Sequence, residues 1–148
     1  MKSYLLALMG VLFACAAQAG PDRISVLLGS NHVNASRSFE EVNPGVFATW
    51  ENPRLHWTVG AYRNSYGRAS VSATVALPVV RWGEGEASLF AGAALYPKDG
   101  RTFAVHSGDV VPIGGVQIRH RKVFMQVIPL DGNLADAVVS VGVTFSLK

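Results

Sequence analysis

Serine, histidine and carboxylate side chains recur in three segments of the chain that a compact fold could bring together. These are the ingredients of acyl transfer, in which a base takes the hydroxyl proton and an acid fixes the imidazole tautomer. Our first-choice triad is Ser65 as nucleophile, His32 as base and Glu40 as orienting acid. The same segments contain alternates for each role, namely Ser107, His106 and Glu41.

Three arginines accompany these residues, and guanidinium groups bind phosphate oxygens in a bidentate manner. Arg63, Arg68 and Arg101 are therefore candidate ligands for lipid phosphates.

The histidine and serine candidates also have a purely structural interpretation. His32 fits a capping or membrane-interface residue, and Asn64 to Gly67 is typical of a tight hairpin turn with Gly67 at positive φ. His56 is better explained as a hydrogen-bonding residue inside the fold than as a ligand.

The sequence predicts no cofactor or metal. Its four histidines are scattered and its single cysteine, Cys15, falls in a segment expected to be removed. No phosphate-binding loop or dinucleotide fingerprint is present. The net charge of +3 is too small, and too evenly spread, to favour nucleic acid as a partner.

The first 19 residues have the pattern of a secretory signal peptide. Lys2 precedes the apolar run Tyr4 to Ala14, and Ala17-Gln18-Ala19 fits the cleavage rule. The apolar run is short for a membrane span of about 20 residues, which makes an N-terminal anchor the weaker alternative. Lipidation of Cys15 is a further alternative, although Phe13 fits a lipobox poorly. We expect export, with a mature domain over residues 20–148.

The mature region alternates with a period of two, which indicates β-strands. Val139, Val141, Val143 and Phe145 share one face of the last segment, opposite Ser140, Gly142 and Thr144. Charged residues make up only 16% of the chain, against about 25% in ordinary soluble domains. A second face of Ser, Thr and Gly suits a packed lumen, with the apolar face toward lipid. A soluble barrel with an apolar interior remains the alternative.

The pattern predicts an all-β fold, an eight-stranded antiparallel up-and-down barrel of outer-membrane type. Its expected strands are Asp22–Asn31, Gly45–Glu51, Leu55–Asn64, Arg68–Trp82, Ala87–Tyr96, Val110–His120, Lys122–Leu130 and Ala135–Leu147. Longer and shorter connections alternate, as in barrels with short periplasmic turns and long outer loops. With the N-terminus in the periplasm, the candidate triad falls at the outer rim. Trp50, Trp57 and Trp82 then fall near the inner ends, and Tyr62, Tyr66 and Tyr96 near the outer ends, where interfacial girdles are expected. The ordinary preference of aromatic residues for strands explains this placement equally well.

Three sequence segments carry a resemblance: Gly29 to His32, Phe39 to Gly45, and Gly60 to Ser65. They resemble segments of small barrel proteins from bacteria and phages. In size and layout the mature region is similar to the eight-stranded outer-membrane group that includes OmpX-like barrels and the lipid A enzymes PagP and PagL. The resemblance implies either a structural or adhesion role, or lipid A acyl chemistry using Ser and His. PagL-like enzymes space His and Ser two apart, whereas His106 and Ser107 are adjacent, so no catalytic assignment is carried over.

The leading expectation is a monomeric structural or interaction protein of the outer membrane that contacts lipopolysaccharide or another outer-membrane lipid through its basic rim. Eight strands are too few for a porin-like channel. The alternatives are a lipid A-modifying acyl hydrolase or acyltransferase, and a soluble periplasmic ligand-binding barrel.

Overall fold

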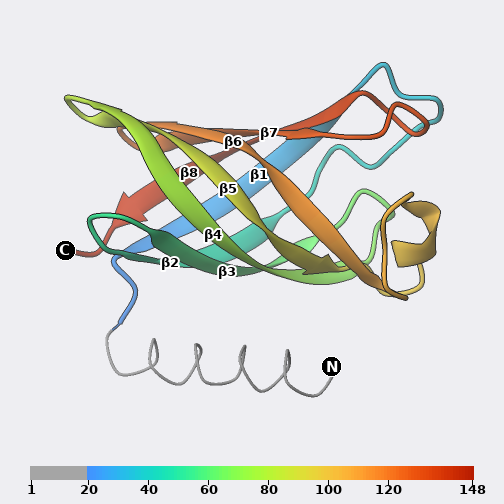
Figure 1. Ribbon diagram of the computed structural model, residues 1–148, viewed down its shortest axis with the longest axis horizontal. Coiled ribbons are helices and arrows are strands. Elements are labelled where there is room, and N and C mark those ends of the chain that lie inside the picture. Colours follow the sequence, from blue (N-terminus) through green and yellow to red (C-terminus); the bar gives the residue numbers. More distant parts are fainter. Residues whose placement is uncertain (1–19) are drawn as a thin grey trace.

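The computed structural model describes residues 20–148, and the expected signal peptide lies outside that range. Eight antiparallel strands close into one barrel in which each strand pairs with its sequence neighbours and β8 pairs with β1 (Figure 1). The predicted all-β, up-and-down architecture is confirmed. The strands are β1 (Arg23–Val33), β2 (Gly45–Glu51), β3 (His56–Arg63), β4 (Ala69–Trp82), β5 (Gly85–Leu95), β6 (Val110–His120), β7 (Val123–Pro129) and β8 (Ala137–Ser146). Among the described residues, no helix is long and apolar enough to cross a membrane.

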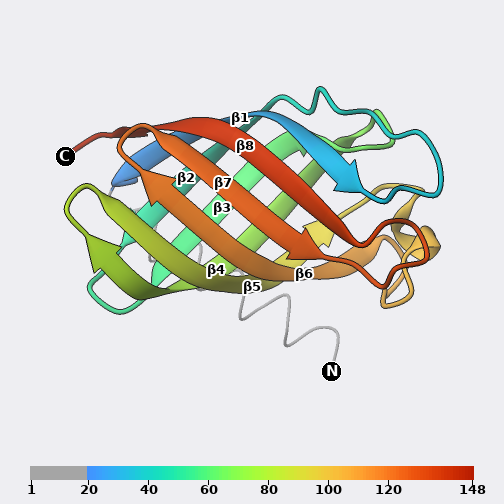
Figure 2. The ribbon, with the colours of Figure 1, turned by 90° about the horizontal axis from the view of Figure 1, so that it is seen from above.

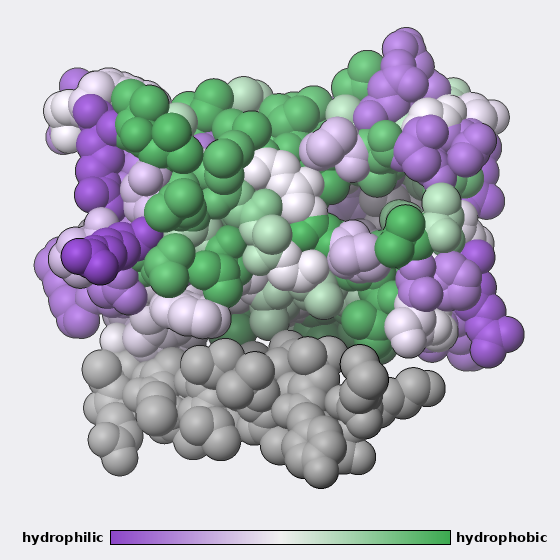
Figure 3. Space-filling view, in the orientation of Figure 1, coloured by the Kyte–Doolittle hydropathy of each residue, from purple (hydrophilic) through white to green (hydrophobic). Residues whose placement is uncertain are grey.

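The two faces of the strands point as the alternation predicts. In β8, Val141 and Phe145 are exposed, while Ser140 and Thr144 are buried at 7% and 3% exposure. The face seen in Figure 3 is apolar across the middle of the barrel and hydrophilic at both ends. This arrangement, with apolar side chains outside and polar ones inside, is the reverse of that in a soluble β-barrel with an apolar core.

The two ends of the barrel differ in the length of their connections. At one end, which we call the short-turn end, the connections span 52–55, 83–84 and 121–122. The other, the long-loop end, has connections 34–44, 64–68, 96–109 and 130–136, the third containing the 3-10 helix η1 (Gly100–Thr102). The start of β1 and the C-terminus both lie at the short-turn end (Figure 2). The predicted alternation is thus confirmed.

Pairing is incomplete in the half of the barrel nearest the long loops. The β6–β7 ladder runs from His120↔Val123 only to Val116↔Val127. Beyond it the first six residues of β6 have no partner in β7, whereas β7 stays paired with β8 as far as Pro129↔Ala137. The two strands visibly diverge toward the long-loop end (Figure 1). The hydrogen-bonded ladder of the barrel wall is therefore interrupted at this position, which we call the lateral gap.

Candidate functional site

An aromatic cavity of about 140 Å³ lies inside the long-loop end. Its walls come from several strands and loops and are mainly aromatic and aliphatic. Tyr96 and Phe103 lie edge to face with ring centroids 4.9 Å apart, and Tyr66 contacts both at 6.4 and 6.2 Å. Two of the predicted triad residues, His32 and Ser65, also line this cavity. The structure therefore brings His32 and Ser65 to one concave site.

His32 is the tenth residue of β1 and is fixed by a ring contact. Its imidazole stacks on Phe39, with centroids 4.0 Å apart and an interplanar angle of 10°. Its Nδ1 atom is buried and has no hydrogen-bond partner within residues 20–148. A buried nitrogen without a partner is uncommon, because losing its hydration costs about 1–3 kcal/mol. The ring is thus positioned by packing, and its Nδ1 forms no hydrogen bond with residues 20–148.

Ser65 sits in the β3–β4 turn, and Asn64 holds that turn together. Asn64 is 1% exposed; its Oδ1 accepts from the backbone N–H groups of Tyr66 and Arg68 at 2.9 and 3.0 Å, and its Nδ2 donates to Ser70 Oγ at 2.9 Å. Gly67 has a φ of 79°, as the turn prediction required. The Ser65 carbonyl also accepts from the N–H of Glu40 at 3.0 Å, which ties the turn to the first loop.

The carboxylates are close to the site but engaged elsewhere. Glu40 lies 3.6 Å from the guanidinium of Arg63, and Glu41 accepts from Asn31 Nδ2 at 3.0 Å. Within the described residues no hydrogen bond joins His32 to Ser65 or to either glutamate. Glu41 is the glutamate whose charge acts on the His32 ring. The folded site therefore places Ser65 and His32 at one cavity, but it does not contain an assembled triad.

The other predicted residues lie outside the cavity. His106 and Ser107 are exposed in the β5–β6 loop. Arg68 Nη1 donates to both carboxylate oxygens of Asp99, and Arg101 is exposed in η1. Two of the three predicted phosphate ligands, Arg63 and Arg68, are thus already paired with carboxylates.

Arg37 is a rim residue that the sequence did not single out for phosphate binding. Its guanidinium carbon lies 5.1 Å from the centroid of Phe39 and 5.0 Å from that of Tyr66, within cation–π range of both. Within residues 20–148 it has no carboxylate partner. The rings orient this cation beside the two candidate catalytic residues. In the sequence, the signal for this role was Phe39, two residues after Arg37 in loop one.

The cavity reaches the lateral gap between β6 and β7. Its lining includes Pro112, Ile113 and Gly114 of β6 and Ile128 and Pro129 of β7, all from the part where the strands have separated. The surface is hollowed between these strands (Figure 3). A proline has no N–H to offer a ladder, so Pro112 and Pro129 suit unpaired stretches of strand. The aromatic cavity thus lies behind an opening in the apolar wall.

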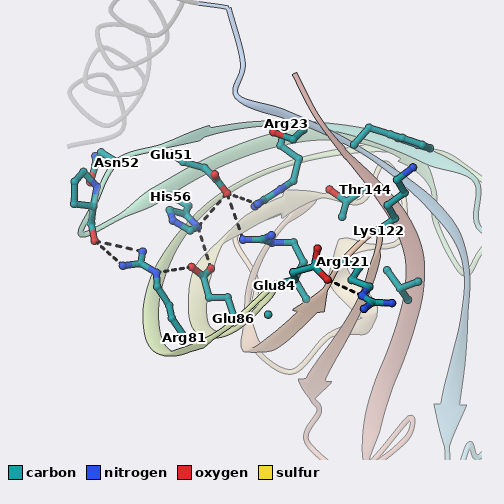
Figure 4. Close-up of a pocket in the computed structure, with 17 residues that line it drawn as sticks. Arg23, Glu51, Asn52, His56, Arg81, Glu84, Glu86, Arg121, Lys122 and Thr144 are labelled. Carbon is teal, nitrogen blue, oxygen red and sulfur yellow. Dashed lines mark hydrogen bonds and ion pairs between the residues drawn. The ribbon is translucent and has the colours of Figure 1, made fainter. Parts of the chain in front are cut away.

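A second, larger cavity of about 1310 Å³ opens at the short-turn end and is lined mainly by charged residues (Figure 4). Glu86 is 4% exposed; it accepts from Arg81 Nε and from Ser88 Oγ, both at 2.9 Å. His56 Nδ1 lies 3.4 Å from Glu86 Oε1 and 3.8 Å from Glu51 Oε1. His56 is buried inside the barrel as predicted, but its Nδ1 forms no hydrogen bond within residues 20–148 and instead faces carboxylates of an ion-pair network. In the sequence, this network could have been recognised from charged residues at lumen-facing positions near the strand ends.

Polar side chains fill the lumen between the two cavities. Ser25 Oγ donates to Thr144 Oγ1 at 2.9 Å, and Gln126 Nε2 donates to Gln117 Oε1 at 2.8 Å. The space left among them is about 20 Å³, roughly room for one water. This packing agrees with the expectation that the barrel is too narrow for a porin-like channel.

No protein-family model matches the chain, and no curated protein matches it either.

Proposed function

We propose that the barrel resides in a bacterial outer membrane with its long-loop end facing outward. The apolar belt supports this: Val71 and Leu77 on β4 and Leu89 on the neighbouring β5 expose 51%, 51% and 52% of their surface. Burying such a belt in lipid is worth roughly 25 cal/mol per Å² of apolar area. The predicted export signal and the alternating connection lengths point in the same direction.

Within that setting we propose that the chain binds an acyl chain of an outer-membrane lipid and acts on it as an acyl hydrolase or acyltransferase. One observation carries this proposal: His32 and Ser65 line a single aromatic cavity whose wall opens between β6 and β7. A lipid in the surrounding leaflet reaches such a cavity sideways without leaving the membrane. Aromatic and aliphatic walls suit a hydrocarbon chain, and Ser and His suit the ester at its end.

The chemistry follows from the two side chains. Ser65 Oγ attacks the ester carbonyl while His32 takes the hydroxyl proton. The C–O bond of the ester then breaks, and the imidazolium returns the proton to the leaving alcohol. Water or another acceptor alcohol removes the acyl group by the same steps in reverse. The Ser65–His32 hydrogen bond forms once the ester is bound, since such bonds are often long or unformed before substrate arrives.

The rim supports a phosphorylated lipid such as lipid A as the substrate. Arg37 is held over two rings beside the cavity, and Arg101, which is exposed in η1, adds a second positive charge at this end of the barrel. This combination fits the resemblance to the group that includes the lipid A enzymes PagP and PagL.

A structural or interaction role at the cell surface is the second candidate, because two long loops are clasped together. Ser36 N–H donates to Leu134 O at 2.9 Å, and Asn34 Nδ2 donates to Asp136 Oδ2 at 2.6 Å. Ordered loops give a fixed outer surface for a partner or for lipopolysaccharide. A soluble periplasmic ligand-binding barrel is the third candidate, which the aromatic cavity favours and the exposed apolar belt disfavours.

Two measurements separate these candidates. Membrane fractionation with heat-modifiable gel mobility tests the location, and recovery only in the soluble periplasm would remove both membrane candidates. Mass spectrometry of lipid A and phospholipids from cells with and without the protein tests the activity. A gained or lost acyl chain supports the enzyme, whereas an unchanged acyl pattern leaves the interaction role.

A further inference from the structure

The cavity at the short-turn end has more cations than anions. Five cationic side chains and three carboxylates line it: Arg23, Arg81, Arg119, Arg121 and Lys122, against Glu51, Glu84 and Glu86. Each carboxylate already has an arginine of its own. Arg23 pairs with Glu51, Arg81 with Glu86 at 2.9 Å, and Arg121 with Glu84 at 2.7 Å. Arg119 and Lys122 are the cations left over.

Arg119 is the one held inside the barrel. Its side chain is 24% exposed, and its nearest carboxylate oxygen is Glu51 Oε1 at 3.9 Å, the outer limit of an ion pair. Glu51 is already bound by Arg23, so its charge is shared. The Nε of Arg119 is buried and has no hydrogen-bond partner within residues 20–148. A half-buried guanidinium with an unused donor is costly unless something else accepts from it.

Other donors face the same part of the cavity. Arg23 is 5% exposed at the start of β1, and Thr144 lies beside it on β8, where Ser25 and Thr144 are paired. The Thr144 N–H donates to the Lys122 carbonyl at 2.8 Å, which brings Lys122 alongside. Arg23, Thr144 and Lys122 are seen along one wall (Figure 4). His56 and Glu86 form a separate, self-neutralised group with Arg81.

We infer that this cavity is an oxyanion-binding site in which Arg119 holds a carboxylate or phosphate group, assisted by Arg23, Lys122 and the Thr144 hydroxyl. Arginine's planar fork matches both kinds of oxyanion, and a water molecule would satisfy the Nε donor without neutralising the charge. The walls focus the field of the surplus cations on the mouth. The cavity is open and large, so the group can be the end of a larger molecule. This site lies at the opposite end of the barrel from His32 and Ser65 and does not depend on the proposed acyl chemistry.

The test uses the mature barrel, labelled with ¹⁵N-arginine, in a non-ionic maltoside detergent. Sodium phosphate and sodium acetate are titrated separately at constant ionic strength, with chloride as the balancing anion. We expect a saturable shift of the Arg119 Nε–Hε resonance. Losing a charge-assisted hydrogen bond costs about 1.5–3 kcal/mol, so Arg119→Gln should weaken binding at least about tenfold. Arg121→Gln, which removes an exposed arginine from the same cavity, should leave affinity within about twofold.

Tighter binding of phosphate indicates a phosphorylated partner, and tighter binding of acetate a carboxylate partner. The inference is overturned if neither anion gives a saturable shift in the wild-type protein, or if Arg119→Gln binds as tightly as wild type. Heat-modifiable mobility reports whether each variant folds. If Arg119→Gln does not fold, Arg119→Lys replaces it; Arg119→Lys keeps the charge but loses the fork, and it should still bind more weakly.

Discussion

The imidazole of His32 lies flat on the ring of Phe39, with their centroids 4.0 Å apart. The contact joins the end of β1 to the first long loop, and it sets the direction in which His32 faces the cavity. Phe39 also lies edge to face with Tyr66, the residue after Ser65. One phenyl ring thus links the positions of both candidate catalytic residues.

Replacing Phe39 should therefore impair acyl chemistry more than folding. An aromatic pair contributes about 0.5–1.5 kcal/mol beyond its buried area, so Phe39→Ala should unfold at moderately lower urea concentration. Its acyl-transfer rate should fall about tenfold or more, because misplacing a catalytic group is costly. Phe39→Tyr, which keeps the ring, serves as the control and should retain most of the rate. Equal rates in Phe39→Ala and wild type would contradict this role.

Asn64 should matter for the turn that carries Ser65. Asn64→Ala removes two acceptor bonds to backbone N–H groups and one donor bond to Ser70. Each unsatisfied buried group costs about 1–3 kcal/mol, so a clear loss of unfolding free energy is expected in urea titrations in micelles. Ser70→Ala removes only the bond to Ser70 and should cost less. An equal loss in the two variants would show that the backbone bonds are unimportant.

Arg37 should be the rim cation that recognises lipid phosphate. Arg37→Ala should weaken binding of a phosphorylated amphiphile several-fold, in line with a solvated charge-assisted contact, and leave binding of its neutral counterpart unchanged. Arg101→Ala, an exposed arginine without the two ring contacts, is the matched control. The measurement is a calorimetric titration in maltoside micelles. A loss of phosphate preference in Arg101→Ala alone would assign the role to Arg101 instead.

Membrane residence predicts a cost for charge on the apolar belt. Leu89 is 52% exposed on β5, and Leu89→Lys should destabilise the folded barrel in lipid bilayers by up to about 2–4 kcal/mol. Val105 is 68% exposed but lies in a long loop, so Val105→Lys should be nearly neutral. Folding into vesicles, followed by gel mobility during urea titration, measures both. If Leu89→Lys has no effect, the belt does not face lipid.

Asp22 should make the closing seam of the barrel sensitive to acid. The Lys148 ammonium, followed by the Glu51 N–H at 2.8 Å, lowers the pKa of this carboxyl below its ordinary value of 3.8. Because this pKa is lower in the folded state, the Asp22 carboxylate stabilises the folded barrel above pH 3.8. This contribution is lost as the pH falls through the folded-state pKa. Asp22→Asn should therefore be slightly less stable than wild type at neutral pH. The difference should disappear in strong acid, as measured by urea unfolding at several pH values.

The sequence predicted the strands well because their alternation is strict and the lumen face is polar. The β2 and β6 bounds agree with the prediction, and the other strands differ from it by no more than two residues at either end. The expected outer girdle of tyrosines was wrong for Tyr62 and Tyr96. Both line the cavity inside the barrel, on the face that the alternation itself assigns to the lumen. Their ring chemistry suggested an interface, but the period of two decides which way they point.

The lateral gap and the ring contacts could not be predicted from the sequence. The gap depends on where the β6–β7 ladder stops, and register arises from pairing between segments rather than from either strand alone. From the sequence we ranked His32 and Ser65 above His106 and Ser107. That only the first two line the cavity depends on which loops fold over the lumen, which sequence spacing does not encode. Glu40 was the first choice for the acid, yet its contact with Arg63 follows from side-chain packing that no spacing encodes.

The most direct test is lipid mass spectrometry on cells expressing four single variants beside wild type. Ser65→Ala and His32→Ala remove the two cavity residues, and Ser107→Ala and His106→Ala remove the same residue types from the exposed loop. We expect wild type, Ser107→Ala and His106→Ala to change the acyl pattern of lipid A or phospholipids alike. Ser65→Ala and His32→Ala should match cells without the protein. An acyl change that survives in Ser65→Ala and His32→Ala, with all variants folded by gel mobility, would contradict acyl chemistry in the aromatic cavity.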